Sequence, residues 1–150
     1  MRVAVALKIR NDALRVIQKH AQQFPAEEVC GLLAGKDGIV ELALRTLNAA
    51  QNPAVEYQIA PAELFAAMRA IRGAGMQFMG VYHSHPDGTG EPSARDIAEA
   101  NYPDVGYAIA TLRENATVNV RAFAIRDGSA EEMAIEIAEG SSPAPSARRR

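Results

Sequence analysis

Two of the three histidines of this 150-residue chain lie one residue apart, in the sequence His83-Ser84-His85-Pro86. A short apolar segment, residues 76–82, precedes them and predicts a buried strand. Because side chains alternate along a strand, His83 and His85 are expected on one face and Ser84 on the other. Two neutral imidazoles that share a face could both bind one metal ion.

A candidate third ligand follows the loop of residues 87–92, where Ser93 opens a helical pattern with Asp96 one turn inside it. This pair has an ordinary explanation, because Ser-x-x-Asp also fits a capping box at a helix start. The loop can nevertheless fold back and bring Asp96 over the two imidazoles. Two histidines and one carboxylate are a ligand set of catalytic zinc, in which water takes the fourth position. We therefore expect a zinc site here.

These residues resemble the JAMM motif of the MPN-domain metalloproteases, and the resemblance extends to a second segment. That family carries a glutamate on an early strand in the form Glu-x-x-Gly-x-Leu-x-Gly, which residues 28–35 match. Glu27 is adjacent, but only Glu28 has the required spacing to Gly31. The resemblance covers about residues 3–126. No motif position is substituted, whereas inactive members of the family have lost the ligands.

The resemblance implies a role for each of five residues. His83, His85 and Asp96 would hold the zinc, which polarises an amide carbonyl and lowers the pKa of its bound water to about 7. Glu28 would take the proton of that water and pass it to the leaving amine. Ser93 would donate a hydrogen bond to the tetrahedral oxyanion. From the residues alone, Glu28 could still be a surface charge and Ser93 only a helix cap.

The resemblance implies a zinc metallopeptidase of the isopeptidase type. The short chain of this protein is similar to those of the bacterial stand-alone members. That similarity implies hydrolysis of an amide bond after the C-terminal Gly-Gly of a small ubiquitin-like sulfur-carrier protein. Such a tail is thin enough to lie beside an exposed strand edge and add to the sheet. The alternative is a non-catalytic MPN module that binds a ubiquitin-like protein or a scaffold partner. A zinc deaminase is excluded, because it needs Pro-Cys-x-x-Cys and this chain has one cysteine.

Composition narrows the partners and the compartment. Acidic residues number 18 against 16 basic ones, of which three are arginines 148–150, so the body is acidic and nucleic acid is not an expected partner. The single cysteine, Cys30, excludes an intramolecular disulfide and is interpreted as core packing. Residues 1–8 meet a charge too early for a signal peptide, and no apolar run is long enough to span a membrane. We expect a cytoplasmic protein, and the resemblance makes a homodimer possible.

Strands and helices mix without a regular βαβ period, so the expected class is α+β (mixed α/β). The resemblance implies the MPN fold, a curved mixed β-sheet flanked by helices. One domain is expected over residues 1–139, followed by a disordered tail over 140–150. The expected strands cover residues 3–7, 29–34, 39–47, 76–82, 105–112, 117–125 and 133–137, and the expected helices cover 11–24, 61–73 and 93–100.

Several side chains outside the motifs carry expectations of their own. Asn11 or Asp12 would cap the first helix, and His20 would lie on its solvated face rather than bind a metal. Phe65 would belong to the apolar stripe of the second helix. The segment around Tyr57 would form a short extended piece.

Overall fold

The computed structural model describes residues 6–138, which form seven strands and three helices. The other residues, 1–5 and 139–150, include the start of the expected first strand and the expected tail, which therefore lie outside the described part. Within residues 6–138, no helix combines the length and the apolar character needed to cross a bilayer. The elements are β1 Ala6–Arg10, α1 Asn11–Gln23, β2 Cys30–Lys36, β3 Ile39–Thr46, α2 Pro61–Gly73, β4 Gln77–Ser84, α3 Ala94–Glu99, β5 Gly106–Leu112, β6 Val118–Arg126 and β7 Ser129–Ala138.

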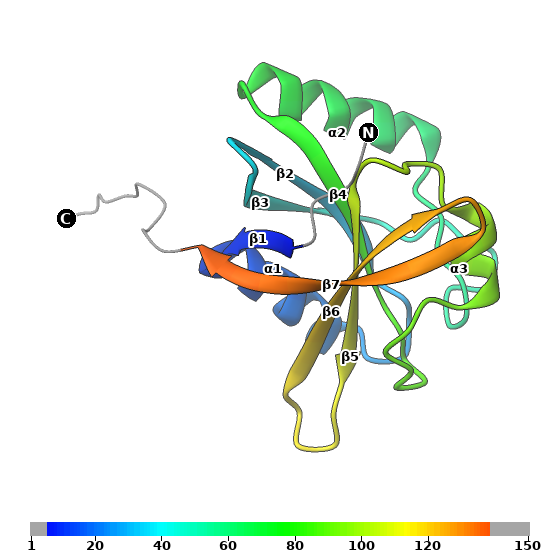
Figure 1. Cartoon of the computed structure of the whole chain (residues 1–150). Coiled ribbons are helices and arrows are strands. Elements are labelled where there is room, and N and C mark those ends of the chain that lie inside the picture. The colour runs from blue at the N-terminus through cyan, green and yellow to red at the C-terminus, as the bar shows by residue number, and fades with distance from the viewer. Residues whose placement is uncertain (1–5, 139–150) are drawn as a thin grey trace.

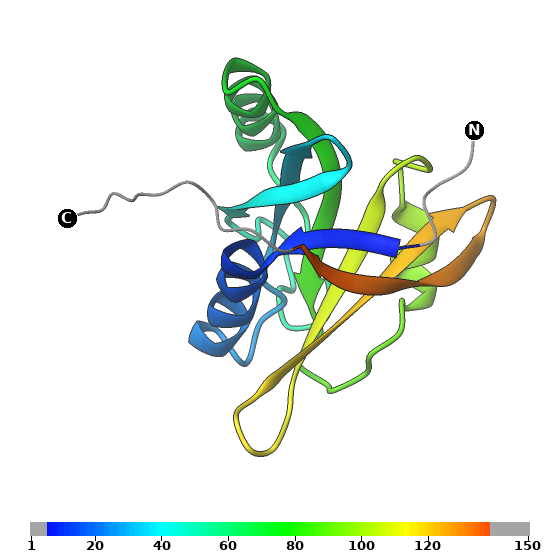
Figure 2. The same cartoon turned by 60° about the vertical axis from the view of Figure 1, so that its left-hand side comes forward.

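The strands close into a barrel in the order β1-β3-β2-β4-β5-β6-β7. β1 runs parallel to β3 and β7, and β4 runs parallel to β5, whereas the remaining neighbours are antiparallel. Figures 1 and 2 show β1 alongside β7, which is the pairing that closes the sheet. The mixed sheet flanked by helices is confirmed, and its closure into a barrel goes beyond what the sequence predicted.

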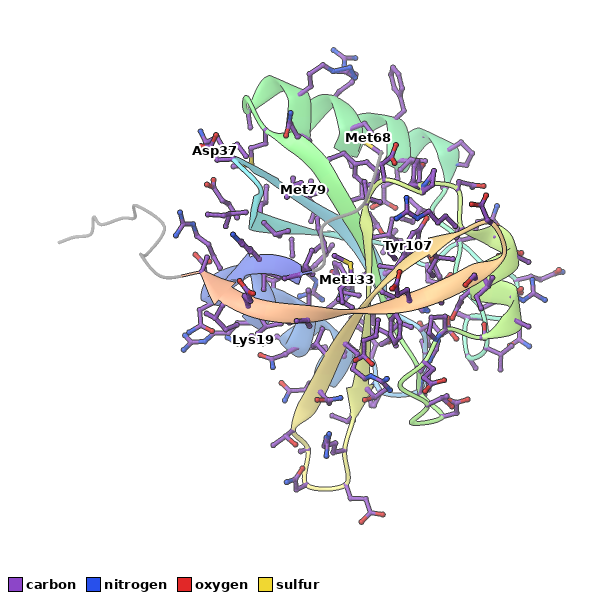
Figure 3. The ribbon with its side chains drawn as sticks, viewed as in Figure 1. Lys19, Asp37, Met68, Met79, Tyr107 and Met133 are labelled. Carbon is purple, nitrogen blue, oxygen red and sulfur yellow. The ribbon has the colours of Figure 1, made fainter. Side chains whose placement is uncertain are left out.

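The strand that carries the histidines separates two hydrophobic clusters. Tyr82 belongs to the cluster that α1 covers, which also contains Met133 in the interior (Figure 3), whereas Val81 belongs to the cluster that α2 covers. Because side chains alternate along β4, His83 follows Val81 on one face and Ser84 follows Tyr82 on the other. The expected opposition between Ser84 and the histidine is thus present in the strand.

Two local predictions in the helices are wrong. α1 begins at Asn11, so Asn11 and Asp12 lie in its first turn and neither is the N-cap. Phe65 of α2 is 63% exposed and lies outside the apolar stripe. That stripe passes through Leu64 and Met68, which are four residues apart and share a face, and Phe65 lies about 100° further round the helix.

His20 is buried, which corrects the expectation of a solvated surface histidine. The residue is 5% exposed, and Nδ1 of its imidazole lies 2.7 Å from the hydroxyl oxygen of Tyr82. His20 follows Ala13 and Ile17 at helical spacing, so it lies on the face of α1 that packs on the sheet. Burial, together with the nearby charge of Arg45, lowers the pKa of His20 to about 4, so the imidazole is neutral at pH 7.

Candidate metal centre

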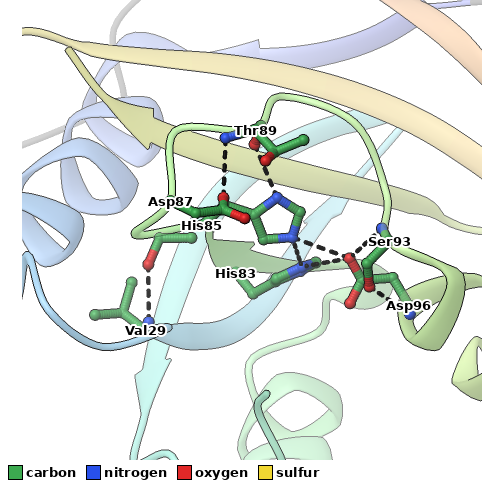
Figure 4. Close-up of polar contacts among 8 residues, drawn as sticks. Val29, His83, His85, Asp87, Thr89, Ser93 and Asp96 are labelled. Carbon is green, nitrogen blue, oxygen red and sulfur yellow. Dashed lines mark hydrogen bonds and ion pairs between the residues drawn. The ribbon is translucent and has the colours of Figure 1, made fainter. Parts of the chain in front are cut away.

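The two motif histidines and the aspartate meet at one point (Figure 4). His83 lies near the end of β4, and His85 follows just after it. Their Nε2 atoms are 3.1 Å apart, and Oδ2 of Asp96 lies 3.2 Å from that of His83 and 3.0 Å from that of His85. Three donor atoms from two elements therefore face the same small volume.

The start of α3 is built by the same pair that supplies the carboxylate. Ser93 is the N-cap, and its Oγ accepts a hydrogen bond of 3.0 Å from the backbone N–H of Asp96. In return, Oδ2 of Asp96 accepts from the backbone N–H of Ser93 at 2.9 Å. The capping box is therefore present, and it aims one carboxylate oxygen at both imidazoles. The two explanations of Ser-x-x-Asp, cap and candidate ligand, are compatible.

The loop between the histidines and α3 orients His85. Nδ1 of His85 donates to the carbonyl oxygen of Thr89 at 2.8 Å, and the N–H of Thr89 donates to Asp87 at 3.0 Å. A carbonyl oxygen is a usual outer partner of a metal-binding histidine. By fixing a proton on Nδ1, the Thr89 carbonyl leaves Nε2 as the nitrogen that can bind a metal ion at the site. The fold-back of this loop, expected from the sequence, is what makes the contact.

His83 is held by stacking. The ring of Tyr57 lies parallel to it within 23°, with the ring centroids 4.4 Å apart. Residues 56–60 belong to no strand, and the short extended piece expected around Tyr57 stays a prediction. The stacking was missed, because nothing in a lone tyrosine of an irregular segment indicates its distant neighbour. Nδ1 of His83 is buried and has no hydrogen-bond partner among residues 6–138.

Glu28 comes from the segment just before β2 and completes the group. It is only 6% exposed, which rules out the surface-charge explanation, whereas Glu27 is exposed. One ligand atom from each of Glu28, His83, His85 and Asp96 lies within 4.8 Å of the others. Oε1 of Glu28 is buried without a hydrogen-bond partner in the described part of the chain. A buried carboxylate oxygen without a partner is costly, so this group fits a site that receives a further atom.

Burial and the neighbouring charges set the protonation of the group. Desolvation raises the pKa of Glu28 to about 7, against the opposing effect of His85. Desolvation would also raise the pKa of Asp96, but its close contacts with the imidazoles of His83 and His85 outweigh it and hold that pKa well below its usual range. Burial lowers the pKa of His83, so its imidazole is neutral. Burial would also lower the pKa of His85, but hydrogen bonds with Asp96 and Thr89 outweigh it and raise that pKa, so a metal ion would replace a proton at that imidazole. A neutral His83, an ionised Asp96 and a Glu28 poised near pH 7 are states that suit a hydrolytic metal site.

A pocket opens beside the candidate centre. It has a volume of about 600 Å³ and lies between residues 56–59 and α3, with Tyr57 in its wall. Arg95 of α3 reaches across to Glu56 at 3.1 Å and also contacts Glu99 at 3.2 Å. Tyr57 lines this pocket and also stacks on His83, so it connects the pocket with the candidate centre.

The chain was compared with known proteins. The profile of the family described as prokaryotic homologs of the JAB domain matches residues 10–126. A desampylase of Haloferax volcanii is 36% identical over 110 residues, which are 72% of this chain and 79% of that protein. A CysO-cysteine peptidase of Mycobacterium tuberculosis is 30% identical over 135 residues, 89% of this chain and 92% of that one. A JAB1/MPN-domain protein from Archaeoglobus fulgidus superposes with a TM-score of 0.59 at 19% identity, covering 91% of this chain and 100% of that one, which shows the shared fold.

Proposed function

The chain belongs to the prokaryotic JAB family of JAMM-type metallopeptidases, and from this membership we propose that it is a zinc-dependent isopeptidase. Its substrate would be an amide bond after the C-terminal Gly-Gly of a ubiquitin-like sulfur-carrier protein. The observation that carries this proposal is the convergence of His83, His85 and Asp96 beside the buried carboxylate of Glu28. We keep the cytoplasm as the compartment and a homodimer as an option, as proposed from the sequence.

His83, His85 and Asp96 would hold the metal, since two neutral imidazoles and one carboxylate are a zinc donor set. When bound, zinc supplies a Lewis acid that makes water more acidic and polarises an amide carbonyl. The capping box and the Thr89 carbonyl would keep Asp96 and His85 from turning away, because each already fixes its side chain.

Glu28 would act as the general base and then as the general acid. A pKa near 7 lets its carboxylate accept a proton from the attacking water and return it to the leaving amine at neutral pH. Oε1 has no partner among the described residues, so it is available for this transfer. The burial of Glu28 thus supports a catalytic use that an exposed carboxylate could not have.

Ser93 would stabilise the oxyanion with its hydroxyl proton. The cap uses a lone pair of Oγ, because the hydroxyl accepts from the N–H of Asp96. The hydroxyl proton is therefore still available to donate outward, and the side chain is exposed at the mouth of the site. Capping and oxyanion binding use different atoms of the same group, so both roles can coexist.

A Gly-Gly tail would lie along residues 56–59. Next to the candidate centre, the end of β4 already pairs with β2 on one side and with β5 on the other, so the free edge that we expected is not offered there by this strand. Gln58 uses its N–H and C=O on Asn48 and Ala49, at 3.1 and 2.7 Å. In an extended segment the adjacent peptide groups point the opposite way, which would leave them for a substrate. The proposed carrier substrate also accords with the name of the CysO-cysteine peptidase among the relatives.

Mass spectrometry of defined conjugates tests the proposal. A ubiquitin-like sulfur carrier joined through its terminal glycine to cysteine or to lysine is incubated with zinc-loaded protein. We expect release of the intact carrier ending in Gly-Gly, and no release after chelation or with the His83→Ala, His85→Ala double variant. Cleavage of unrelated unfolded peptides but of neither conjugate would show a general peptidase instead.

A further inference from the structure

Glu28 lies in irregular backbone, two residues before the first residue of β2. β2 begins at Cys30, so the peptide groups around Glu28 are not satisfied by a complete strand ladder. The residue is 6% exposed, and buried peptide groups need partners. The partners that they find therefore determine where the side chain of Glu28 starts.

One hydroxyl holds the chain on both sides of Glu28. Oγ of Ser84 accepts a hydrogen bond of 2.9 Å from the N–H of Val29, the contact drawn at Val29 in Figure 4. The same hydroxyl donates to the carbonyl oxygen of Glu27 at 3.3 Å. The backbone N–H of Ser84 adds a third contact, 3.0 Å from the carbonyl oxygen of Val29. Ser84 is thus bonded to the residue before Glu28 and to the residue after it.

The remaining two groups belong to Glu28 itself. Its N–H donates to the carbonyl oxygen of Pro53 at 2.8 Å, and its carbonyl oxygen accepts from Nδ2 of Asn48 at 2.8 Å. These contacts hold the segment from outside the sheet, whereas Ser84 ties it to the strand that ends at the metal centre. Within the described residues, Oε1 of Glu28 has no such anchor, so the direction of the carboxylate depends on the backbone.

We propose that Ser84 is a positioning residue, whose hydroxyl holds the backbone on both sides of Glu28 and so fixes the place of its carboxylate. This inference rests on the proposed role of Glu28 as the base. Ser84 lies between His83 and His85 but faces away from them, toward the segment of Glu28. The strand that presents the histidines therefore also fixes the base relative to them, through one serine. A displacement of the base by about 1 Å can lower the rate by about 100-fold, so a small loosening is measurable.

Ser84→Ala removes the hydroxyl with little change in volume. We expect kcat on the carrier conjugate to fall by about 10- to 100-fold, with KM and zinc content unchanged, because the metal ligands and the pocket keep their own contacts. We also expect the backbone amide proton of Val29 to exchange faster in NMR, because its acceptor is gone. Ser84→Cys, whose thiol is a weak hydrogen-bond partner, should show a smaller loss and serves if the alanine variant does not fold.

Tyr82→Phe is the matched control. It deletes another buried hydroxyl of β4, one that bonds to His20 of α1 and not to the segment of Glu28. We expect a loss of stability but a kcat within twofold of the wild type. A fall in kcat equal to that of Ser84→Ala would show a general effect of destabilised β4 and overturn the inference.

A double-variant cycle separates positioning from other roles. In the Glu28→Gln background, Ser84→Ala should cause no further loss of rate, because the group that it positions is already disabled. Additive losses, a kcat of Ser84→Ala within twofold of the wild type, or unchanged exchange at Val29 would each contradict the proposal. If wild-type protein cuts neither conjugate, the proposed function fails, and exchange at Val29 still decides whether Ser84 holds this segment.

Discussion

Glu28→Gln should stabilise the metal-free protein at neutral pH while it destroys activity. Burial raises the pKa of Glu28 from 4.5 to about 7, and one pKa unit is worth about 1.4 kcal/mol. Ionised Glu28 in the folded protein therefore costs about 3 kcal/mol. The side chain is almost fully buried, so screening by solvent reduces this figure little.

The sign of the pH dependence follows from proton binding. Between pH 4.5 and 7 the folded state keeps the proton of Glu28, whereas the unfolded chain has lost it. The contribution of Glu28 to wild-type stability therefore falls as pH rises through this window, and Glu28→Gln removes that contribution. The free energies of unfolding of the two proteins should be similar at about pH 4 and should differ by about 3 kcal/mol at pH 8, with the variant more stable.

Urea unfolding of metal-free protein from pH 4 to 8 measures the difference. Glu27→Gln is the control, because Glu27 is the exposed neighbour of Glu28. Its substitution should change the free energy of unfolding by less than about 0.5 kcal/mol. Zinc-loaded Glu28→Gln should keep its metal and lose about 100-fold or more in kcat. A variant no more stable than the wild type at pH 8, or a wild-type rate in the variant, would refute the reasoning.

Three further predictions concern the ligands, the cap and the buried histidine. The His83→Ala, His85→Ala double variant should retain no stoichiometric zinc in elemental analysis, and retention would remove the site from the proposal. If the Ser93 hydroxyl serves the oxyanion, Ser93→Ala should lower kcat by about 100-fold or more. If the hydroxyl is a helix cap alone, the same change should lower the free energy of unfolding by about 1 kcal/mol and leave kcat nearly unchanged. His20 should titrate near pH 4 in NMR, and its contribution to stability should be lost as pH falls from 6.5 toward 4, because the unfolded chain takes up that proton first. Titration of His20 near 6.5 would contradict its burial.

The sequence predicted best what local geometry controls. His83 lies in β4 and His85 follows directly after its last residue, so a period of two was enough to place both on one face. Ser93 and Asp96 are in one helical turn, so their spacing predicted the capping box. Both relations join residues that are close in the sequence, so they do not depend on how the rest of the chain folds.

Relations between distant segments were beyond the sequence. Glu28 reaches the histidines only through the pairing of β2 with β4, and its approach to them was expected from the family resemblance alone. The stacking of Tyr57 on His83 and the burial of His20 also depend on packing between elements. Closure of the barrel rests on β1, a strand of five residues that pairs with both β3 and β7. No local pattern indicates either of its partners.

The glycine of Glu-x-x-Gly has a physical reason in the same pairing. Gly31 lies opposite Tyr82 in the register of β2 and β4, and Cys30 lies opposite His83. A Cβ on Gly31 would overlap the ring of Tyr82 and the carbonyl oxygen of Leu44, so any other residue would force the strands apart. Spreading them would displace His83 from the segment that carries Glu28. The spacing in the motif thus joins a base to a backbone position at which glycine lets the base's strand lie close to the metal ligands.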